Sequence, residues 1–115
     1  LGLRNHILPR RNYDLGFSLE NLVYFELLRR GYKVMIGRIG NTEVDFVAEK
    51  QGAYTYYQVT ADMTAQETFE REMRPLTQIR DNYEKIILTA DRLTVGNYNG
   101  IRVKNLTDWL LGKDN

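Results

Sequence analysis

Two short segments in the middle of the chain alternate apolar and polar side chains, and this pattern limits the folds that the chain can adopt. They are residues 42–48 (TEVDFVA) and residues 54–60 (YTYYQVT), with Gln51 and Gly52 between them. A period of two is typical of β-strands, and a Gln-Gly pair suits the tight turn of a hairpin. The sequence predicts an antiparallel hairpin, closed by a two-residue loop at Gln51-Gly52 or by a four-residue loop over residues 50–53.

Both loop lengths give the hairpin the same register, which places Asp45 opposite Gln58 and Glu43 opposite Thr60. Because strand side chains alternate between faces, these four residues are expected on one face, with directly opposed Cβ atoms about 5 Å apart. Four apolar residues are expected on the other face: Val44, Phe46, Tyr57 and Val59. The polar face is either the remnant of a metal site or a polar sheet surface.

Signals along the rest of the chain predict further helices and strands around this hairpin. Ser18 is suited to cap a helix over residues 19–30, and Gly31 is suited to end it. Residues 64–67 form a capping box for a second helix, which Pro75 must kink or interrupt. The remaining expected elements are strands at residues 33–36, 85–89 and 101–103, and a short last helix begun by Asn105 or Thr107.

The order of these elements predicts the class of fold. A strand that is reached through a crossover helix is normally parallel to its neighbour, with a right-handed connection. The second helix separates the hairpin from the strand at residues 85–89, so a mixed β-sheet flanked by the two main helices is expected. Residues 96–100, which begin and end with glycine, indicate a plain turn.

Composition excludes several classes of protein. The chain has 115 residues, of which 43% are hydrophobic and 27% charged, and this favours one folded domain. It contains no cysteine, so it has neither disulfides nor a thiolate zinc site, and we expect a cytoplasmic protein. No apolar run approaches the roughly 20 residues that span a bilayer, so we expect no membrane partner. The first residue is Leu1, which we interpret as the start of a piece of a longer protein.

An acid on a helix, an acid on a following strand and an acid-x-lysine element on the next strand form the core of the PD-(D/E)xK nuclease superfamily, which this chain resembles. The resemblance implies a restriction-endonuclease-like mixed sheet, with Glu20 and Asp45 as the first two acids. The third element should be Glu-x-Lys, and here it is Gln58-Val59-Thr60. The nuclease site is therefore expected in outline but altered at two positions.

The chain is also similar to a narrower group, the C-terminal domain of unknown function that follows the ATPase module in a family of prokaryotic AAA-type ATPases. The matching stretches are residues 2–5, 20–27, 30–32, 43–47, 57–59, 71–72, 85–89 and 91. This resemblance implies that residues 1–115 are one domain from the C-terminal part of a longer ATPase, and that glutamine is usual at position 58. Because the chain has no G-x-x-x-x-G-K-[ST] motif, ATP would act only through that ATPase module.

A nuclease of this type needs two or three oxygen ligands for Mg²⁺ or Mn²⁺, and a cation near the attacking water. The candidate ligands are Asp45, Gln58, and either Glu20 or Glu43. Thr60 carries no charge, so Arg71 or Lys33 would have to replace the missing lysine. Two alternatives stay open: a purely structural hydrogen-bond network around Asp45 and Gln58, and a residual site that binds metal or phosphate without cleavage.

Basic residues favour a second hypothesis, a nucleic-acid interface. The candidates are Arg10 and Arg11 near the start of the chain, and Arg71 on the second helix. Acidic residues share that helix, however, and such a mixture is also typical of a solvated face.

These observations lead to one expected function and two alternatives. We expect an accessory module of an AAA-type ATPase, without catalysis of its own, that binds DNA, RNA or a protein partner. The first alternative is a metal-dependent nuclease with Asp45, Glu20 and Gln58 as ligands. The second is a structural module that docks onto the ATPase module, or dimerises through the C-terminal helix that carries Trp109.

Overall fold

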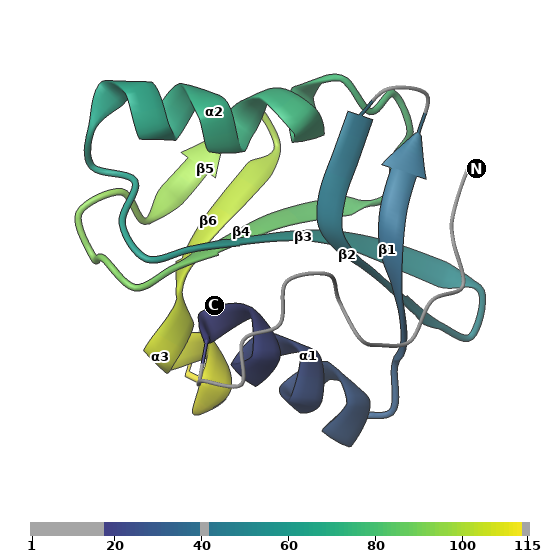
Figure 1. The fold of residues 1–115 in the computed structure, drawn as a ribbon. Helices are drawn as coiled ribbons and strands as arrows, with labels where there is room; N and C mark the ends of the chain where they lie inside the picture. The colour runs from purple at the N-terminus through teal and green to yellow at the C-terminus, as the bar shows by residue number, and fades with distance from the viewer. Residues whose placement is uncertain (1–17, 40–41, 114–115) are drawn as a thin grey trace.

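The computed structural model describes residues 18–39 and 42–113 of the chain. A six-stranded sheet lies in the middle, with α2 on one face and α1 and α3 on the other (Figure 1). The elements in chain order are α1 (Leu19–Arg29), β1 (Lys33–Ile39), β2 (Thr42–Lys50), β3 (Ala53–Thr60), α2 (Gln66–Thr77), β4 (Glu84–Thr89), β5 (Gly96–Tyr98), β6 (Ile101–Asn105) and α3 (Leu106–Leu110). No helix in the described part of the chain has the length and apolar character needed to cross a membrane.

The sheet is mixed, as the order of predicted elements indicated. Its strands lie in the order β1-β2-β3-β4-β6-β5. The first three form an antiparallel meander, whereas β4 is parallel to β3 and β6 is parallel to β4. The prediction of an α/β fold in which the strand after the crossover helix is parallel to the hairpin is confirmed.

The hairpin between β2 and β3 is closed by a two-residue loop. Gln51 and Gly52 have φ angles of 55° and 82°, and Lys50 pairs with Ala53. Positive φ at both central positions is the type I′ geometry that matches the twist of antiparallel strands. The predicted register holds from this turn as far as the pair Phe46–Tyr57, and the longer loop is excluded.

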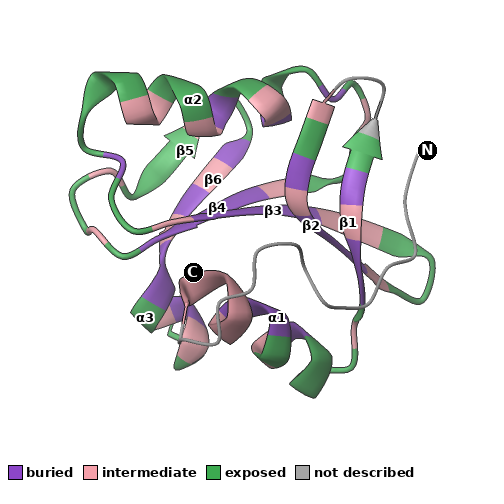
Figure 2. Ribbon diagram, viewed as in Figure 1, coloured by how far each residue is buried: buried purple, intermediate pink, exposed green. Residues whose placement is uncertain are grey.

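Each face of the sheet carries its own hydrophobic core, and the buried positions follow the strand interiors and the inner faces of the helices (Figure 2). The core beneath α1 and α3 includes Val23, Leu27, Phe46, Tyr57, Leu88 and Trp109. The core beneath α2 includes Val44, Val47, Tyr56, Met73, Leu76 and Ile87.

Helix α1 begins and ends as the sequence predicted. The Ser18 hydroxyl accepts a hydrogen bond from the Asn21 N–H at 3.1 Å, which satisfies one of the free donors of the first turn. Arg30 is the C-cap, and Gly31 follows with a φ of 92°. Glycine adopts this left-handed conformation without the steric cost that a Cβ atom brings.

Two local predictions were wrong. The capping box does not form, because the Thr64 hydroxyl binds Asp62 at 2.6 Å and Ala65 is the N-cap of α2. Pro75 lies in the last turn of α2, which ends two residues later at Thr77. Residues 96–98 are not a plain turn but the edge strand β5, which pairs with β6.

Candidate functional site

A β-bulge interrupts the ladder between β1 and β2 at the predicted site. Met35 pairs with Val47, but the next pair recorded along β1 is Gly37 with Val44. One residue of β1 therefore lies opposite the two residues of β2 at positions 45–46. An extra residue of this kind bends its strand and changes the direction of its side chains, and bulges are common beside functional sites.

The bulge corrects the predicted division of β2 into two faces. Val44 and Phe46 were expected on the same face of the sheet, but Val44 belongs to the core beneath α2 and Phe46 to the core beneath α1 and α3. Both Val44 and Val47 consequently point to the α2 face. A Cβ atom on Gly37 would overlap the Cγ2 atoms of both valines, so the bulge requires glycine at this position of β1.

Asp45 and Gln58 join β2 to β3 through side chains where the recorded backbone pairing ends. The Asp45 N–H donates to Gln58 Oε1 at 2.8 Å, and the Val59 N–H donates to Asp45 Oδ2 at 2.9 Å. Because a backbone N–H can only donate, the oxygen of the Gln58 amide must face Asp45 and its NH₂ must face away. The Gln58 amide and the Asp45 carboxylate thus take the place of backbone carbonyl groups as hydrogen-bond acceptors between β2 and β3.

Glu72 of α2 is the further member of this network, and it was not among the predicted site residues. Gln58 Nε2 donates to Glu72 Oε1 at 3.2 Å, and only 6% of Gln58 is exposed. One sequence signal could have indicated Glu72: it lies three residues after Phe69 and one before Met73, on the face of α2 that packs on the sheet. A carboxylate that lies among apolar residues on the buried side of a helix usually has a polar partner on the surface against which the helix packs.

The Glu72 carboxyl is in a setting that disfavours its charge. Burial raises its pKa, and the nearby charge of Glu20 acts in the same direction. Arg71 and the hydrogen bond from Gln58 act in the opposite direction but do not cancel these effects. Glu20, in the first turn of α1, therefore lies within electrostatic range of Glu72.

Glu43 and Thr60 do not join this network. Glu43 pairs with Arg38 of β1, and the Arg38 guanidinium lies 3.7 Å from its carboxylate. Thr60 pairs with Thr89 of β4. The expectation that these two residues share a face of the hairpin is wrong: Val44 packs beneath α2, so Glu43 points to the other face, whereas Val59 packs beneath α1 and α3, so Thr60 points to the α2 face.

The predicted cations lie in different places. Arg71 is exposed on α2 next to Glu72, close enough to affect its pKa. Lys33 pairs with Glu49, four residues along β2 from Asp45, and so lies at the other end of that strand. Arg10 and Arg11 lie outside the described residues.

The residues present do not form a ready site for Mg²⁺ or Mn²⁺. Within residues 18–39 and 42–113, no three His, Cys, Asp or Glu side chains lie close enough together to hold a metal ion. An oxygen of Asp45 and the oxygen of Gln58 also accept backbone hydrogen bonds. The ligand set of Asp45, Gln58 and Glu20 stays a prediction, and we derive no chemical step from it.

Trp109 is part of the core. Only 2% of it is exposed, and its ring centre lies 5.8 Å from that of Tyr57. Arg30 covers the indole from α1, with its guanidinium carbon 4.3 Å from the ring centre. Arg30 also donates to the Trp109 carbonyl at 2.6 Å. This tryptophan therefore joins α3 to α1 and does not form an exposed docking surface.

The fold and the site define an α/β protein with a mixed six-stranded sheet and a partly buried Asp–Gln–Glu hydrogen-bond network. No protein-family model matches the chain. It is similar to an uncharacterized protein of Haemophilus influenzae (strain Rd), with 38% identity over 110 residues. The match covers 96% of this chain and 27% of that protein, so the chain spans about a quarter of the length of this relative.

Proposed function

We propose that the chain is a restriction-endonuclease-like module of a longer AAA-type ATPase, and that it binds nucleic acid without cleaving it. The main support for the loss of catalysis is the hydrogen bonding of the Gln58 amide. Its oxygen accepts from the Asp45 N–H, and its nitrogen donates to Glu72. A glutamate at this position would have no proton at neutral pH with which to bind Glu72. The neutral amide suits a structural network better than a metal site.

The position of the missing lysine supports the same proposal. Thr60 lies two residues after Gln58 on β3 and pairs with Thr89. A hydroxyl supplies no positive charge to position an attacking water or to stabilise a phosphorane-like transition state. Arg71, on the rim of the network, is suited to hold a phosphate group, because a guanidinium matches phosphate oxygens in pairs.

The test is a cleavage assay combined with a binding assay. The chain is incubated with plasmid, single-stranded DNA and RNA in Mg²⁺ or Mn²⁺, beside Asp45→Ala and the exposed control Glu43→Ala. We expect no cleavage by any of them. We also expect fluorescence anisotropy to detect binding of labelled nucleic acid that weakens steeply with salt, as phosphate contacts require.

Metal-dependent cleavage would favour the nuclease alternative. One observation supports this alternative: the charge of Glu20 on α1 contributes to the raised pKa of Glu72 on α2, so acidic side chains from two helices are close enough to influence each other. In this case Asp45→Ala and Glu20→Ala should abolish activity, whereas Glu43→Ala should leave it unchanged.

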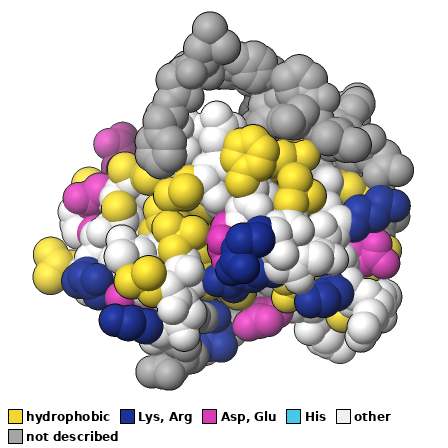
Figure 3. Space-filling model, turned by 90° about the horizontal axis from the view of Figure 1, so that it is seen from below, with side chains coloured by type: hydrophobic (Ala, Val, Ile, Leu, Met, Phe, Trp, Pro, Cys, Tyr) yellow, Lys and Arg dark blue, Asp and Glu magenta, His cyan; other side chains and the backbone are white. Residues whose placement is uncertain are grey.

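A third function, docking or dimerisation, rests on the face of the molecule that carries α1. Phe25, Leu28 and Leu111 are 59%, 43% and 62% exposed. Figure 3 shows hydrophobic side chains gathered in the middle of this face, with Lys and Arg around them. Light scattering that detects a stable dimer, lost in Phe25→Ser, would favour this function over nucleic-acid binding.

A further inference from the structure

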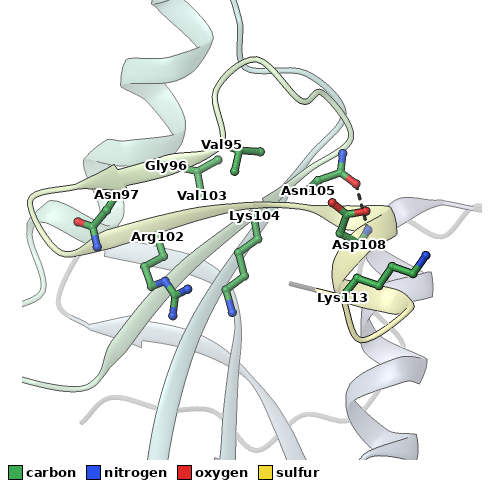
Figure 4. A pocket seen from close by; sticks show the side chains of 9 residues that line it. All are labelled: Val95, Gly96, Asn97, Arg102, Val103, Lys104, Asn105, Asp108 and Lys113. Carbon is green, nitrogen blue, oxygen red and sulfur yellow. Dashed lines mark hydrogen bonds between the residues drawn. The ribbon is translucent and has the colours of Figure 1, made fainter. Parts of the chain in front are cut away.

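A hollow of about 640 Å³ lies at the edge of the sheet that is farther from the Asp–Gln–Glu network (Figure 4). Its walls are β5, β6 and the segment around α3. The side chains that matter for its chemistry are Val95, Asn97, Arg102, Lys104, Asp108 and Lys113. None of these belongs to the site described above.

The alternation of β6 brings two of the cations to the same face. Ile101 and Val103 are buried in the core beneath α2, so Arg102 and Lys104 must point to the opposite face of the sheet. Figure 4 shows both side chains extending from the same side of β6. Residues two apart on a strand are about 7 Å apart, so these cations form a short row along the strand.

The hollow has an excess of positive charge. Among the described residues that line it, Arg102, Lys104 and Lys113 are cationic and Asp108 is the one acid. The two Asp108 oxygens accept hydrogen bonds from Arg92 at 2.9 and 3.2 Å, so its charge is largely offset. Arg102 lies 3.6 Å from Glu84, with 37% and 47% of the two side chains exposed. An exposed ion pair of this length contributes little to stability, so an anion can compete with it.

We propose that this hollow binds the sugar–phosphate backbone of a single nucleic-acid strand, with Arg102 and Lys104 contacting successive phosphates. The inference rests on the nucleic-acid binding proposed above and adds a contact region at the edge of the sheet farther from Arg71. Arg102 and Lys104 are aligned along β6, and an extended nucleic-acid chain presents its successive phosphates in a similar line. Val95, which is 48% exposed at the rim, offers an apolar surface to a sugar or a base.

The lining favours a nucleic acid over an acidic protein. No aromatic residue is among the described residues that line this hollow, so it offers neither the aromatic anchor of a stable protein interface nor an aromatic platform for base stacking, and it suits the charged backbone of a ligand. Its ligand groups are instead guanidinium and ammonium donors, with the Asn97 amide beside them. Such groups bind phosphate oxygens without selecting a base sequence.

The test compares two double variants with the same change in charge. Arg102→Ala/Lys104→Ala removes the row on β6. Lys33→Ala/Arg38→Ala is the control at the opposite edge of the sheet, where Arg38 forms an ion pair with Glu43 at 3.7 Å that resembles the Arg102–Glu84 pair. Fluorescence anisotropy with labelled oligothymidylate is measured over a range of salt concentrations. Circular dichroism checks that both variants unfold at the same temperature as the parent chain.

We expect the β6 variant to bind at least tenfold more weakly than the parent chain, and the control to bind within about twofold. The slope of log affinity against log salt should also become shallower by about 1.4 for two lost phosphate contacts. If the parent chain binds but both variants lose affinity equally, the hollow is not the site, although nucleic-acid binding stands. If the parent chain does not bind, both proposals fail. If polyglutamate binds as tightly as the oligonucleotide, with the same loss in the β6 variant, the hollow is a site for an acidic protein and the nucleic-acid assignment is wrong.

Discussion

Arg30 lies across the indole of Trp109 and also donates a hydrogen bond to its carbonyl oxygen. One side chain at the end of α1 therefore makes two contacts with α3. The same guanidinium binds Glu26 at 2.7 Å, one turn back on α1, and this ion pair fixes its direction. The two helices on this face of the sheet are thus joined by a positioned cation as well as by apolar packing.

Replacing Arg30 with alanine should lower the free energy of unfolding by about 1 to 2 kcal/mol, because a partly buried cation–π contact and a charged hydrogen bond are lost together. Arg29 is the matched control. It also binds Glu26, but 71% of its side chain is exposed, so Arg29→Ala should cost less than about 0.5 kcal/mol. Urea denaturation measures both values, and an equal cost for the two variants would contradict the contact with α3.

Replacing Glu72 with glutamine should stabilise the chain at neutral pH. The pKa of Glu72 is raised above its ordinary value of 4.5, so between these two values the folded chain holds a proton that the unfolded chain has released. Stability therefore falls as pH rises through this window. Glutamine removes the buried charge and still offers an oxygen to Gln58.

The gain from Glu72→Gln should shrink as pH falls below 4.5, because Glu72 then becomes protonated in both states. Glu70→Gln is the control, because Glu70 is exposed on the same helix. Thermal unfolding at a series of pH values measures both effects. A Glu72→Gln variant that is less stable than the parent chain at pH 7 would show that the charge itself is needed.

Replacing Gln58 with glutamate should destabilise the chain at pH 7 by about 2 to 4 kcal/mol. The amide donor to Glu72 is lost, and a new carboxylate faces both Asp45 and Glu72 in a buried setting. If the residues around it are the remnant of a metal site, Mn²⁺ should raise the melting temperature of Gln58→Glu more than that of the parent chain. Equal shifts, or none, would argue against metal binding at this point.

Replacing Gly37 with alanine should cost about 1 to 3 kcal/mol, because the added methyl group overlaps Val44 and Val47. A second substitution, Val44→Ala, removes one of these contacts and should be less harmful in the Gly37→Ala background than in the parent chain. A double-mutant cycle measured by denaturant unfolding gives this coupling. Additive costs would show that the bulge relaxes to accept a side chain on β1.

The periodic parts of the fold were predictable from the sequence because local signals agreed with the final packing. The alternation around Gln51-Gly52 predicted the hairpin and its register as far as Phe46–Tyr57, and Ser18 and Gly31 correctly marked the ends of α1. The crossover through α2 predicted the parallel pairing of β3 and β4. Each of these predictions rested on residues that lie close together in the sequence.

The candidate site was less predictable because it depends on a local exception. Asp45 lies in a bulge, and strict alternation cannot predict a bulge, so Val44 and Glu43 were placed wrongly. Glu72 was missed because its partner, Gln58, is on another element 14 residues away. Asp45 and Gln58 were predicted to interact, but their contact uses a side-chain amide and a backbone N–H in place of two opposed side chains.

The position of β6 has a consequence for how the chain is synthesised and folds. Although β5 comes first in the sequence, β6 lies between β4 and β5. Until residues 101–105 leave the ribosome, β4 is an open edge, and its Ile86, Ile87 and Leu88 have no neighbour on that side. An uncovered apolar edge strand readily pairs with another chain. A nascent chain that stalls after β4 should therefore aggregate or recruit a chaperone, whereas one that has released β6 closes this edge within its own fold.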